Sequence, residues 1–343
     1  MTISLALLGF GNVGRAFARL LLRKRADLAE RYGITFRVTG IATGRHGIAI
    51  DPDGLDLTRA LELVEAGQSL APLSRKTIPD TGAFLAEVPA DVLFENTPVN
   101  HETGEPAITH IRTALARGMH AITANKGPVV HAYGELTRLA AEKGRRFLFE
   151  STVMDGAPIF SLFREALPGA RLLAFRGVLN STTNLILTRM EAGETFEEAV
   201  AYAQSIGIAE TDPSADVDGW DAAIKVAALV TVLMGIPLKP QEVEREGIRS
   251  ITAEKIATAR AEGKRWKLVC SARREGEGVL ARVRPEKVSP DSPLYGVEGT
   301  TSIVQFETDV LGLLSVIEAD PGPETTAYGL LADFLNAVRP QSY

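Results

Sequence analysis

Short apolar runs alternate with longer amphipathic segments along the first third of the chain. The run from Ile3 to Leu8 is apolar apart from Ser4, a pattern typical of a strand buried on both faces of a parallel sheet. Apolar residues then recur every three or four positions as far as Leu28, which predicts a helix. A second strand is expected over residues 34–42. The chain therefore begins with a strand–helix–strand unit.

The same alternation returns after residue 90. Residues 47–90, in between, are interpreted as a loop, a helix over 57–65 and a proline-rich connection. Strands separated by helices are typical of a Rossmann-like, doubly wound parallel sheet, so the expected fold class of this part is α/β. The predicted strands are 91–95, 119–124 and 146–151, and the predicted helices are 103–117 and 131–143.

The pattern changes after residue 157, where runs of helices precede runs of strands. This order predicts an α+β domain for substrate binding and sheet-mediated dimerisation. We expect a dinucleotide-binding domain over 1–150, joined by the C-terminal segment 319–343, and a catalytic and dimerisation domain over 151–318. The predicted strands of the second half are 172–179, 265–272, 278–288, 300–307 and 310–318, and the predicted helices are 183–192, 196–206, 252–262 and 325–338.

Composition narrows the class of protein. A hydrophobic content of 45% and a charged content of 23% are ordinary for a soluble globular chain. The net charge of −6 and the absence of a long basic run argue against a nucleic-acid partner. The longest apolar stretch, 226–238, is shorter than the ~20 residues that span a bilayer, and the N-terminus lacks the basic region of a signal peptide. With a single cysteine, Cys270, expected in the core, a cytoplasmic protein without membrane contacts is predicted.

A glycine-rich turn follows the first strand directly. Gly9, Gly11 and Gly14 form a GxGxxG pattern between a strand and a helix, the context that the dinucleotide-binding fingerprint requires. Glycine permits the tight turn and the close approach of a ligand to the backbone, and the helix N-terminus faces the pyrophosphate. Together with Asn12 and Val13, these glycines are the predicted cofactor-binding residues of the turn.

The end of the second strand bears on the choice of cofactor. An NAD-specific site usually carries a carboxylate there, which binds the ribose 2′-hydroxyl. This chain has Thr43-Gly44-Arg45-His46 and no acidic residue. Arg45 therefore favours a 2′-phosphate, and NADP(H) is the preferred cofactor, with NAD(H) as the alternative. The competing interpretation is a solvated loop arginine.

An acidic segment, ETDPSADVDGWDAAIK, leads into a strongly apolar helix. Asp221 and Lys225 are four residues apart, so they share one face of that helix. Desolvation and charged partners tune a lysine for proton transfer, which makes Lys225 a candidate acid–base group. The alternative is a solvated acidic loop followed by a helix with an ordinary ion pair. Lys126, at the end of another strand, is a second candidate, although loop lysines are commonly solvated.

Five motifs occur in a specific order: GFGNVG at 9–14, TANKGP at 123–128, FESTVMDGAPIF at 149–160, GVLNSTTNLIL at 177–187 and AETDPSADVDGWDAAIK at 209–225. In their order and spacing the chain resembles homoserine dehydrogenase in its short form, without a C-terminal regulatory domain. The resemblance covers nearly the whole chain. It implies reduction of L-aspartate 4-semialdehyde to L-homoserine with NAD(P)H, on the route to threonine, methionine and isoleucine, by a homodimer.

The resemblance also implies catalytic roles. Lys126 and Lys225 would flank the reacting carbon, with one of them supplying the proton and Asp221 orienting them. The carboxylates of Glu210 and Asp216 would hold the substrate, chiefly its ammonium group. This distribution of charge is chemically reasonable, because carboxylates attract an ammonium group and amines stabilise negative charge that develops on oxygen.

Further contacts follow from the same resemblance. Thr97, Lys126 and the loop at Gly322 would lie near the nicotinamide ribose, and Ser181 and Thr182 would contact the substrate. The chain departs from the family pattern in three places. Ser181 replaces a usual glycine, Ile208 replaces a usual aromatic residue, and 320–324 replaces a loop rich in glycine and alanine.

A monovalent-cation site is the last implication of the resemblance. Backbone carbonyls of Glu150, Val153, Asp155 and Ala157 would hold Na⁺ or K⁺. An interdomain hinge turn around Gly156 is the alternative. The histidines show no HExxH or paired-ligand spacing, so no transition-metal centre is predicted.

Two alternative functions remain open at this point. The departures from the family pattern leave room for a reductase of the same fold that acts on another amino-acid semialdehyde or oxo acid. A nucleotide-binding module without catalysis is the third reading. The presence of Lys126, Asp221 and Lys225 argues against that module, because binding alone does not need them.

Overall fold

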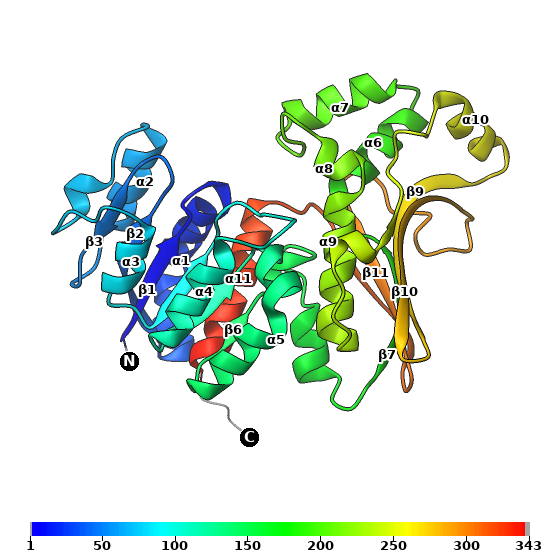
Figure 1. Cartoon of the computed structure of the whole chain (residues 1–343). Coiled ribbons are helices and arrows are strands. Elements are labelled where there is room, and N and C mark those ends of the chain that lie inside the picture. The colour runs from blue at the N-terminus through cyan, green and yellow to red at the C-terminus, as the bar shows by residue number, and fades with distance from the viewer. Residues whose placement is uncertain (1, 340–343) are drawn as a thin grey trace. The chain divides into compact units, whose positions relative to one another are not determined.

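The structure is a computed structural model, and it describes residues 2–339. The chain divides into two compact units (Figure 1). The first consists of the residues up to Pro158 together with those from Gly322 onward. The second runs from Ile159 to Pro321.

The first unit is built on a mixed six-stranded sheet with the order β3-β2-β1-β4-β5-β6. All pairings are parallel except that of the edge strand β3 with β2. This confirms the Rossmann-like α/β prediction. The strands are β1 (Thr2–Leu8), β2 (Thr35–Ala42), β3 (Ile48–Ile50), β4 (Val92–Glu95), β5 (His120–Thr123) and β6 (Phe147–Leu148).

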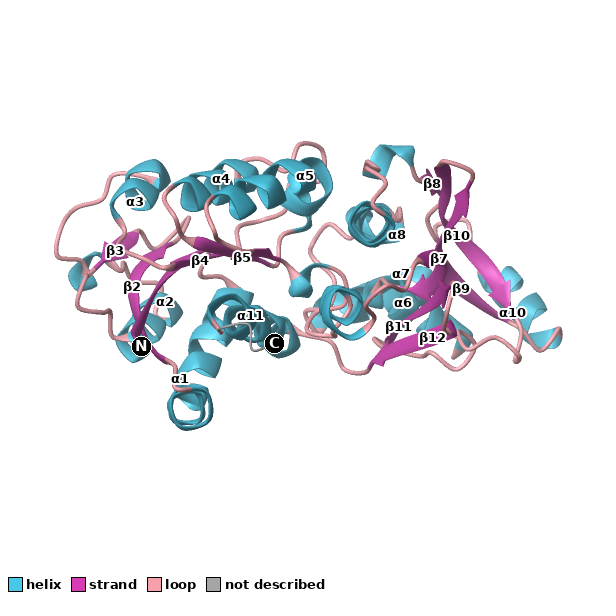
Figure 2. Ribbon diagram, turned by 90° about the horizontal axis from the view of Figure 1, so that it is seen from below, coloured by secondary structure: helices cyan, strands magenta, loops and turns pink. Residues whose placement is uncertain are grey.

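Helices cover both faces of this sheet (Figure 2). On one side lie α3 (Thr81–Glu87), α4 (Ala107–Ala116) and α5 (Lys126–Glu142). On the other lie α1 (Asn12–Tyr32), α2 (Leu57–Glu65) and α11 (Pro323–Val338). The sheet is therefore buried on both faces, as its apolar strands require.

Three phenylalanine rings bind the last helix to this sheet. Phe94 on β4 lies 4.4 Å from Phe17 on α1 and 6.1 Å from Phe334 on α11, measured between ring centroids. All three side chains are fully buried. Aromatic pairs at these distances add to the free energy of burial, so α11 is a structural part of the first unit.

Some predicted elements of this unit were wrong or incomplete. The region 47–90 contains β3 and α3 in addition to the predicted helix. Helix α5 begins at Lys126 rather than at 131, because the Asn125 side chain accepts a hydrogen bond from Gly127 N and caps the helix. The strand predicted over 146–151 is only β6, and a 3₁₀ turn over Glu150–Thr152 follows it.

The second unit contains another six-stranded sheet, with the order β12-β11-β7-β9-β10-β8. Its long strands pair antiparallel, which confirms the α+β prediction, and the short β8 pairs parallel with β10. The sequence did not reveal β8, which has only two residues. The strands are β7 (Leu172–Val178), β8 (Glu244–Arg245), β9 (Arg265–Glu275), β10 (Gly278–Val288), β11 (Ser302–Thr308) and β12 (Gly312–Glu318).

The helices of the second unit carry most of its candidate site residues. The acidic segment is not a simple loop, because it includes the short helix α8 (Ser214–Val217) before α9 (Trp220–Leu229). Helix α9 is almost wholly buried, as its apolar sequence predicts, and continues in a wider π turn over Val230–Met234. The other helices are α6 (Ser181–Glu191), α7 (Phe196–Ser205) and α10 (Ala253–Ala261).

Candidate active site

The glycine-rich turn joins β1 to α1 and leaves no room for side chains at two positions. Gly9 has a φ of +93°, and a Cβ there would lie 2.3 Å from the carbonyl oxygen of Asn96. A Cβ on Gly14 would lie 2.4 Å from the carbonyl oxygen of Gly9. At Gly11, by contrast, a Cβ would meet nothing within 4 Å, so the backbone there is open to an approaching ligand. This is the geometry in which a helix N-terminus can receive a phosphate group.

A buried carboxylate, which the sequence analysis missed, stands beside this turn. Glu95 ends β4, is fully buried, and pairs in register with Leu8 of β1 and Thr123 of β5. Its Oε1 accepts hydrogen bonds from the backbone N–H of Thr97, at 3.1 Å, and from the Thr97 hydroxyl. Its Oε2 lies 3.0 Å from the Thr123 hydroxyl. Glu95 therefore joins the carboxyl ends of neighbouring strands, where ligands of such sheets bind.

Asn125 connects the loops that carry Thr97 and Lys126. Its amide nitrogen donates to the Thr97 carbonyl at 3.1 Å, and its amide oxygen caps α5. Lys126 is half-buried in the first turn of that helix. Thr97 and Lys126 are thus held by one hydrogen-bonded network within the first unit. The family resemblance implied that both residues lie near the nicotinamide ribose, but it did not reveal Asn125 as the link between them.

Arg45 lies at the exposed tip of the turn between β2 and β3. The turn is held by Thr43, whose hydroxyl accepts from His46 N at 2.7 Å. The exposed guanidinium is available to a ligand at the carboxyl end of β2.

In the second unit, Asp221 and Lys225 form the ion pair expected from their spacing. Lys225 Nζ lies 3.0 Å from Asp221 Oδ2 and donates to the carbonyl of Leu179 at 2.7 Å. The side chains of Asp221 and Lys225 are only 16% and 14% exposed, so the pair is partly buried, although the alternative interpretation also expects an ion pair on this helix. A partly buried ammonium held between a carboxylate and a carbonyl has a defined orientation.

Asn180 is the second residue that the sequence analysis missed. It is 3% exposed and precedes α6. Its side-chain nitrogen donates to Asp216 Oδ1 at 2.6 Å and to Asp221 Oδ2 at 2.9 Å. Its side-chain oxygen accepts from Thr183 N at 2.8 Å, which caps the helix. The available signal was an asparagine directly before a helical run, which predicts a cap but not the bridge between carboxylates.

Burial and neighbouring charges shift the pKa values of ionisable side chains near Asn180. Burial raises the pKa of Asp216, and the charge of Asp221 raises it further, while the hydrogen bond from Asn180 and the charge of Lys225 lower it. Burial raises the pKa of the Cys270 thiol to about 12, so this cysteine is an inert core residue, as predicted.

The other acidic residues of the segment do not join this cluster. Glu210 is exposed, and it is its backbone carbonyl that accepts a bond, from Gln204 at 3.2 Å. The Asp212 side chain accepts from Ser214 N at 3.0 Å, and Asp218 pairs with Arg249.

Ser181 and Thr182 occupy the first turn of α6, beside Asn180. The Ser181 hydroxyl lies 3.4 Å from that of Ser302. The Thr182 hydroxyl, which is 5% exposed, donates to the carbonyl of Ile208 at 3.3 Å.

A buried lysine lies deeper in the same unit. Lys267 on β9 is fully buried and donates to Asn184 Oδ1 at 2.9 Å and to the Val297 carbonyl. Burial lowers its pKa to about 8. The sequence analysis read WKLVC only as a core strand, although a lysine inside an apolar run signals a buried partner.

The segment proposed to bind a cation is an irregular turn of the first unit. Its backbone adopts a φ of +38° at Asp155, and a Cβ on Gly156 would lie 2.3 Å from the Thr325 carbonyl oxygen. Two of its turns are closed through the carbonyls of Phe149 and Met154, neither of which is one of the four proposed ligands. Gly322 caps α11 beside this turn, and its carbonyl accepts from Thr326 N at 3.0 Å.

Within residues 2–339, histidine, cysteine, aspartate and glutamate side chains form no group of three suited to a metal ion. None of the helices there has the length and apolar character that crossing a membrane requires.

Comparison with known proteins covers both units. Residues 9–150 match the family model "Homoserine dehydrogenase, NAD binding domain", and residues 158–335 match the model "Homoserine dehydrogenase". A homoserine dehydrogenase of Methanocaldococcus jannaschii is 39% identical over 97% of this chain and 98% of its own. An NAD(+)-dependent homoserine dehydrogenase of Pseudomonas canavaninivorans is 36% identical over 97% of this chain and 95% of its own. A hyperthermophilic archaeal homoserine dehydrogenase in complex with NADPH is 32% identical, with a TM-score of 0.83 over 98% of each chain.

Proposed function

Because the chain belongs to the homoserine dehydrogenase family, whose members are oxidoreductases acting on a CH–OH group, we propose that it reduces L-aspartate 4-semialdehyde to L-homoserine with a nicotinamide cofactor. The observation that carries the chemical part of this proposal is the partly buried Asp221–Lys225 pair. A non-catalytic binding module would have no use for such a pair.

Lys225 is the proposed proton donor. The Leu179 carbonyl and Asp221 hold its ammonium group in a fixed direction within a largely apolar helix. In aldehyde reduction, negative charge develops on the carbonyl oxygen, and a pre-oriented ammonium group stabilises that charge and then protonates it. Asp216 would bind the α-ammonium group of the substrate, because a half-buried carboxylate attracts a cation more strongly than an exposed one. Glu210 keeps this role only as a more distant and exposed contributor.

The first unit would hold the cofactor, which supplies or accepts the hydride when bound. The Gly9–Gly14 turn would receive the pyrophosphate at the start of α1, and Thr97, Lys126 and Gly322 would lie toward the nicotinamide end. The Glu95 and Asn125 network supports this, because it fixes Thr97 and the start of α5 before any ligand binds.

The test is a spectrophotometric assay of the purified chain with L-homoserine, using NADP⁺ and NAD⁺ in parallel. Growth of the reduced-nicotinamide absorbance is the expected result. If aspartate semialdehyde and homoserine are both inert while another amino-acid semialdehyde is reduced, the substrate assignment is wrong. Ser181 and Ile208 would then be the first residues to exchange for the family's glycine and aromatic residue.

We propose NADP(H) as the preferred cofactor, on the basis of Arg45. Replacing Arg45 with alanine should raise the KM for NADPH by roughly tenfold, the effect of about 1.4 kcal/mol, and change that for NADH little. The reason is that only NADPH carries the 2′-phosphate that an arginine binds. An equal loss for both cofactors would remove Arg45 from this role. Arg59, an exposed residue of α2 that pairs with Glu62, is a suitable control position.

A monovalent cation, Na⁺ or K⁺, is proposed to bind the carbonyls of Glu150, Val153, Asp155 and Ala157. The irregular turn with its positive φ at Asp155 supports this, since backbone in sparsely populated conformations clusters at ligand-binding sites. Activity in K⁺, Na⁺ and choline salts of equal ionic strength should differ if the cation is bound, and identical rates would argue for a simple turn.

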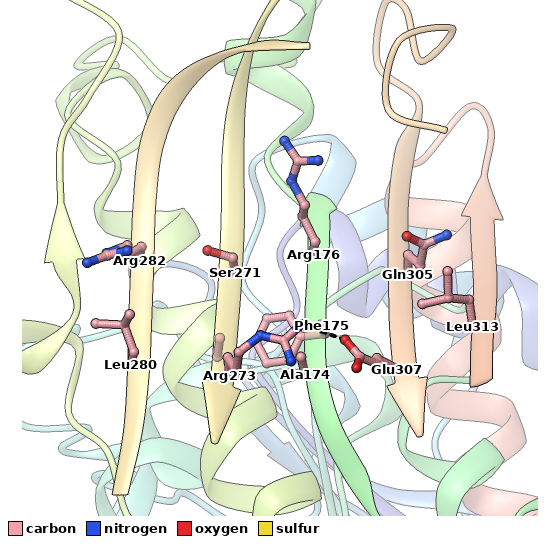
Figure 3. Close-up of a pocket in the computed structure, with 11 residues that line it drawn as sticks. Ala174, Phe175, Arg176, Ser271, Arg273, Leu280, Arg282, Gln305, Glu307 and Leu313 are labelled. Carbon is pink, nitrogen blue, oxygen red and sulfur yellow. Dashed lines mark hydrogen bonds and ion pairs between the residues drawn. The ribbon is translucent and has the colours of Figure 1, made fainter. Parts of the chain in front are cut away.

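A homodimer is proposed to form through the sheet of the second unit. One face of β7, β9, β10, β11 and β12 contains a hollow of about 340 Å³ whose lining mixes apolar and charged side chains (Figure 3). Arg273 and Glu307 pair across it at 2.6 Å. Two apolar residues of β12, Leu313 and Ile317, are 65% and 62% exposed. Exposed apolar side chains beside charged pairs are typical of an interface core with a polar rim.

Leu313→Lys with Ile317→Lys should convert a dimer into monomers, because two buried ammonium groups per subunit would face their symmetry mates. Light scattering after size exclusion would give the mass. Tyr328→Lys, at an exposed position on α11 of the first unit, is the matched control and should leave the mass unchanged. A dimer that persists in the double variant would place the interface elsewhere.

We further propose that this reaction takes place in the cytoplasm, as a step toward threonine and methionine. The family membership supports the pathway. A strain lacking the gene should require both amino acids, and growth without them would contradict the proposal.

A further inference from the structure

Asn180 occupies an unusual position between two carboxylates and a helix. Its amide nitrogen carries two hydrogens, and the structure gives each an acidic partner, Asp216 at 2.6 Å and Asp221 at 2.9 Å. Its amide oxygen accepts from the backbone N–H and from the hydroxyl of Thr183, both at 2.8 Å. The side chain is 3% exposed, so water cannot readily replace any of these bonds.

The negative charges of Asp216 and Asp221 repel each other, and the amide of Asn180 between them offsets that repulsion by donating to both. Burial and the charge of Asp221 both favour the protonated form of Asp216. The hydrogen bond from Asn180 acts in the opposite direction, because a donor stabilises the charged acceptor. Among the described residues, groups that face the pair include the Lys225 ammonium on the same helix as Asp221, the Thr182 hydroxyl on α6, and the buried Cys270 thiol on β9.

We propose that Asn180 is a positioning residue that keeps Asp216 and Asp221 together in their charged forms, and thereby sets the lowest pH at which the enzyme binds substrate and orients Lys225. This rests on the proposed function of the two carboxylates. Asp221 Oδ2 accepts from Asn180 at 2.9 Å and lies 3.0 Å from Lys225 Nζ, so one oxygen links the amide to the proposed proton donor. A proton on either carboxylate would weaken the attraction for the substrate's ammonium group or release Lys225.

The sign of the expected effect follows from these contacts. Without the amide donor, the charged form of Asp216 loses stabilisation and its pKa rises further. The carboxylate is then protonated at pH values where the native enzyme keeps it charged. The acidic limb of the kcat/KM profile should therefore move to higher pH, by about one unit, the typical spread of carboxyl pKa values among folded proteins.

Asn180→Ser is the variant that isolates this role. Serine caps helices about as well as asparagine, so α6 should still begin normally, but its single hydroxyl hydrogen cannot bridge two carboxylates. Asn180→Asp also keeps the cap and adds a third acidic group, so its acidic limb should move at least as far. Thr183→Val is the control: it removes a hydroxyl from the same buried turn and leaves the bonds from Asn180 to the carboxylates in place.

The experiment measures kcat/KM for L-homoserine from pH 5 to pH 10 for the full-length native enzyme and the three variants, with thermal unfolding as a check of folding. A shift of the acidic limb in both Asn180 variants, and none in Thr183→Val, is the expected result. Lower rates with an unshifted limb would overturn the proposal and leave Asn180 as a helix cap only.

A second measurement tests the role of Asn180 independently of the proposed enzymatic function. Carbon-13 titration of the aspartate carboxyl groups, with Asp216→Asn and Asp221→Asn used for assignment, follows their protonation without any substrate. If the native chain does not oxidise homoserine, the function is wrong, yet the carboxyl titration still decides whether Asn180 controls the charge of the pair. Unchanged carboxyl titrations in Asn180→Ser would refute the inference.

Discussion

Lys225→Ala should lower kcat for homoserine oxidation by roughly 10²–10⁴-fold, the range assigned to a positioned acid–base group. The variant removes the ammonium group that Asp221 and the Leu179 carbonyl orient. The Kd for NADPH, measured by fluorescence, should change little, because the proposed cofactor turn belongs to the other unit. The effect should therefore be on turnover and not on cofactor binding.

Two further variants show whether the loss of kcat in Lys225→Ala arises in the chemical step. Lys255→Ala removes an exposed lysine of the same unit, whose ammonium group donates to the Ser250 carbonyl, and should leave kcat unchanged. Lys126→Ala, measured in parallel, divides the roles of the two lysines. A larger loss of kcat in Lys126→Ala, together with near-normal turnover in Lys225→Ala, would make Lys126 the proton donor and Lys225 a structural partner of Asp221.

Gly9→Ala should raise the Kd for NADPH by at least about tenfold, equivalent to 1.4 kcal/mol or more. The φ of +93° is costly for any residue with a Cβ, on the order of 1–3 kcal/mol. The added carbon would also lie 2.3 Å from the Asn96 carbonyl oxygen, which is backbone and cannot rotate away. The turn must then move away from the end of β4, where Glu95 holds Thr97.

Variants of two other glycines distinguish backbone strain from the loss of space for the ligand. Gly134→Ala lies within α5 with nothing within 4 Å of its Cβ, and should be neutral or slightly stabilising in thermal unfolding. Gly11→Ala also has open space, so the chain should fold normally and any weakening of NADPH binding would report contact with the cofactor. Gly9→Ala with native affinity would show that the turn does not bind the nucleotide.

Much of the fold was predictable because its signals are local. Buried parallel strands are apolar at most positions, so β1 and β4 could be identified from a few residues each. The helix over 57–65 and the strand over 278–288 were predicted with the bounds that the structure has. Two of the missed elements, β3 and β8, are strands of three and two residues, and such short strands exist only because a longer neighbour pairs with them.

In the candidate site too, local contacts were predictable from the sequence and long-range contacts were not. The Asp221–Lys225 pair was predictable, because four residues along a helix bring two side chains together whatever the rest of the chain does. The contact between Asn180 and Asp221 spans 41 residues, and that between Glu95 and Thr123 spans 28. No local sequence pattern predicts contacts between residues so far apart along the chain. Conversely, Glu210 belongs to the acidic segment in sequence, yet its side chain remains exposed while Asp216 is drawn toward Asn180.

The sequence by itself determined the two-part α/β and α+β architecture, the glycine-rich turn and the shared helical face of Asp221 and Lys225, because each depends on residues that are neighbours along the chain. It also gave the family resemblance, because five motifs occur in a specific order and spacing. Only the tertiary structure decided which polar residues are buried and what they contact. Asn180 and Glu95 look like ordinary polar residues in the sequence, and their burial comes from strands and helices that pack over them. A buried polar group must find its partner in three dimensions, since water is no longer there to supply one.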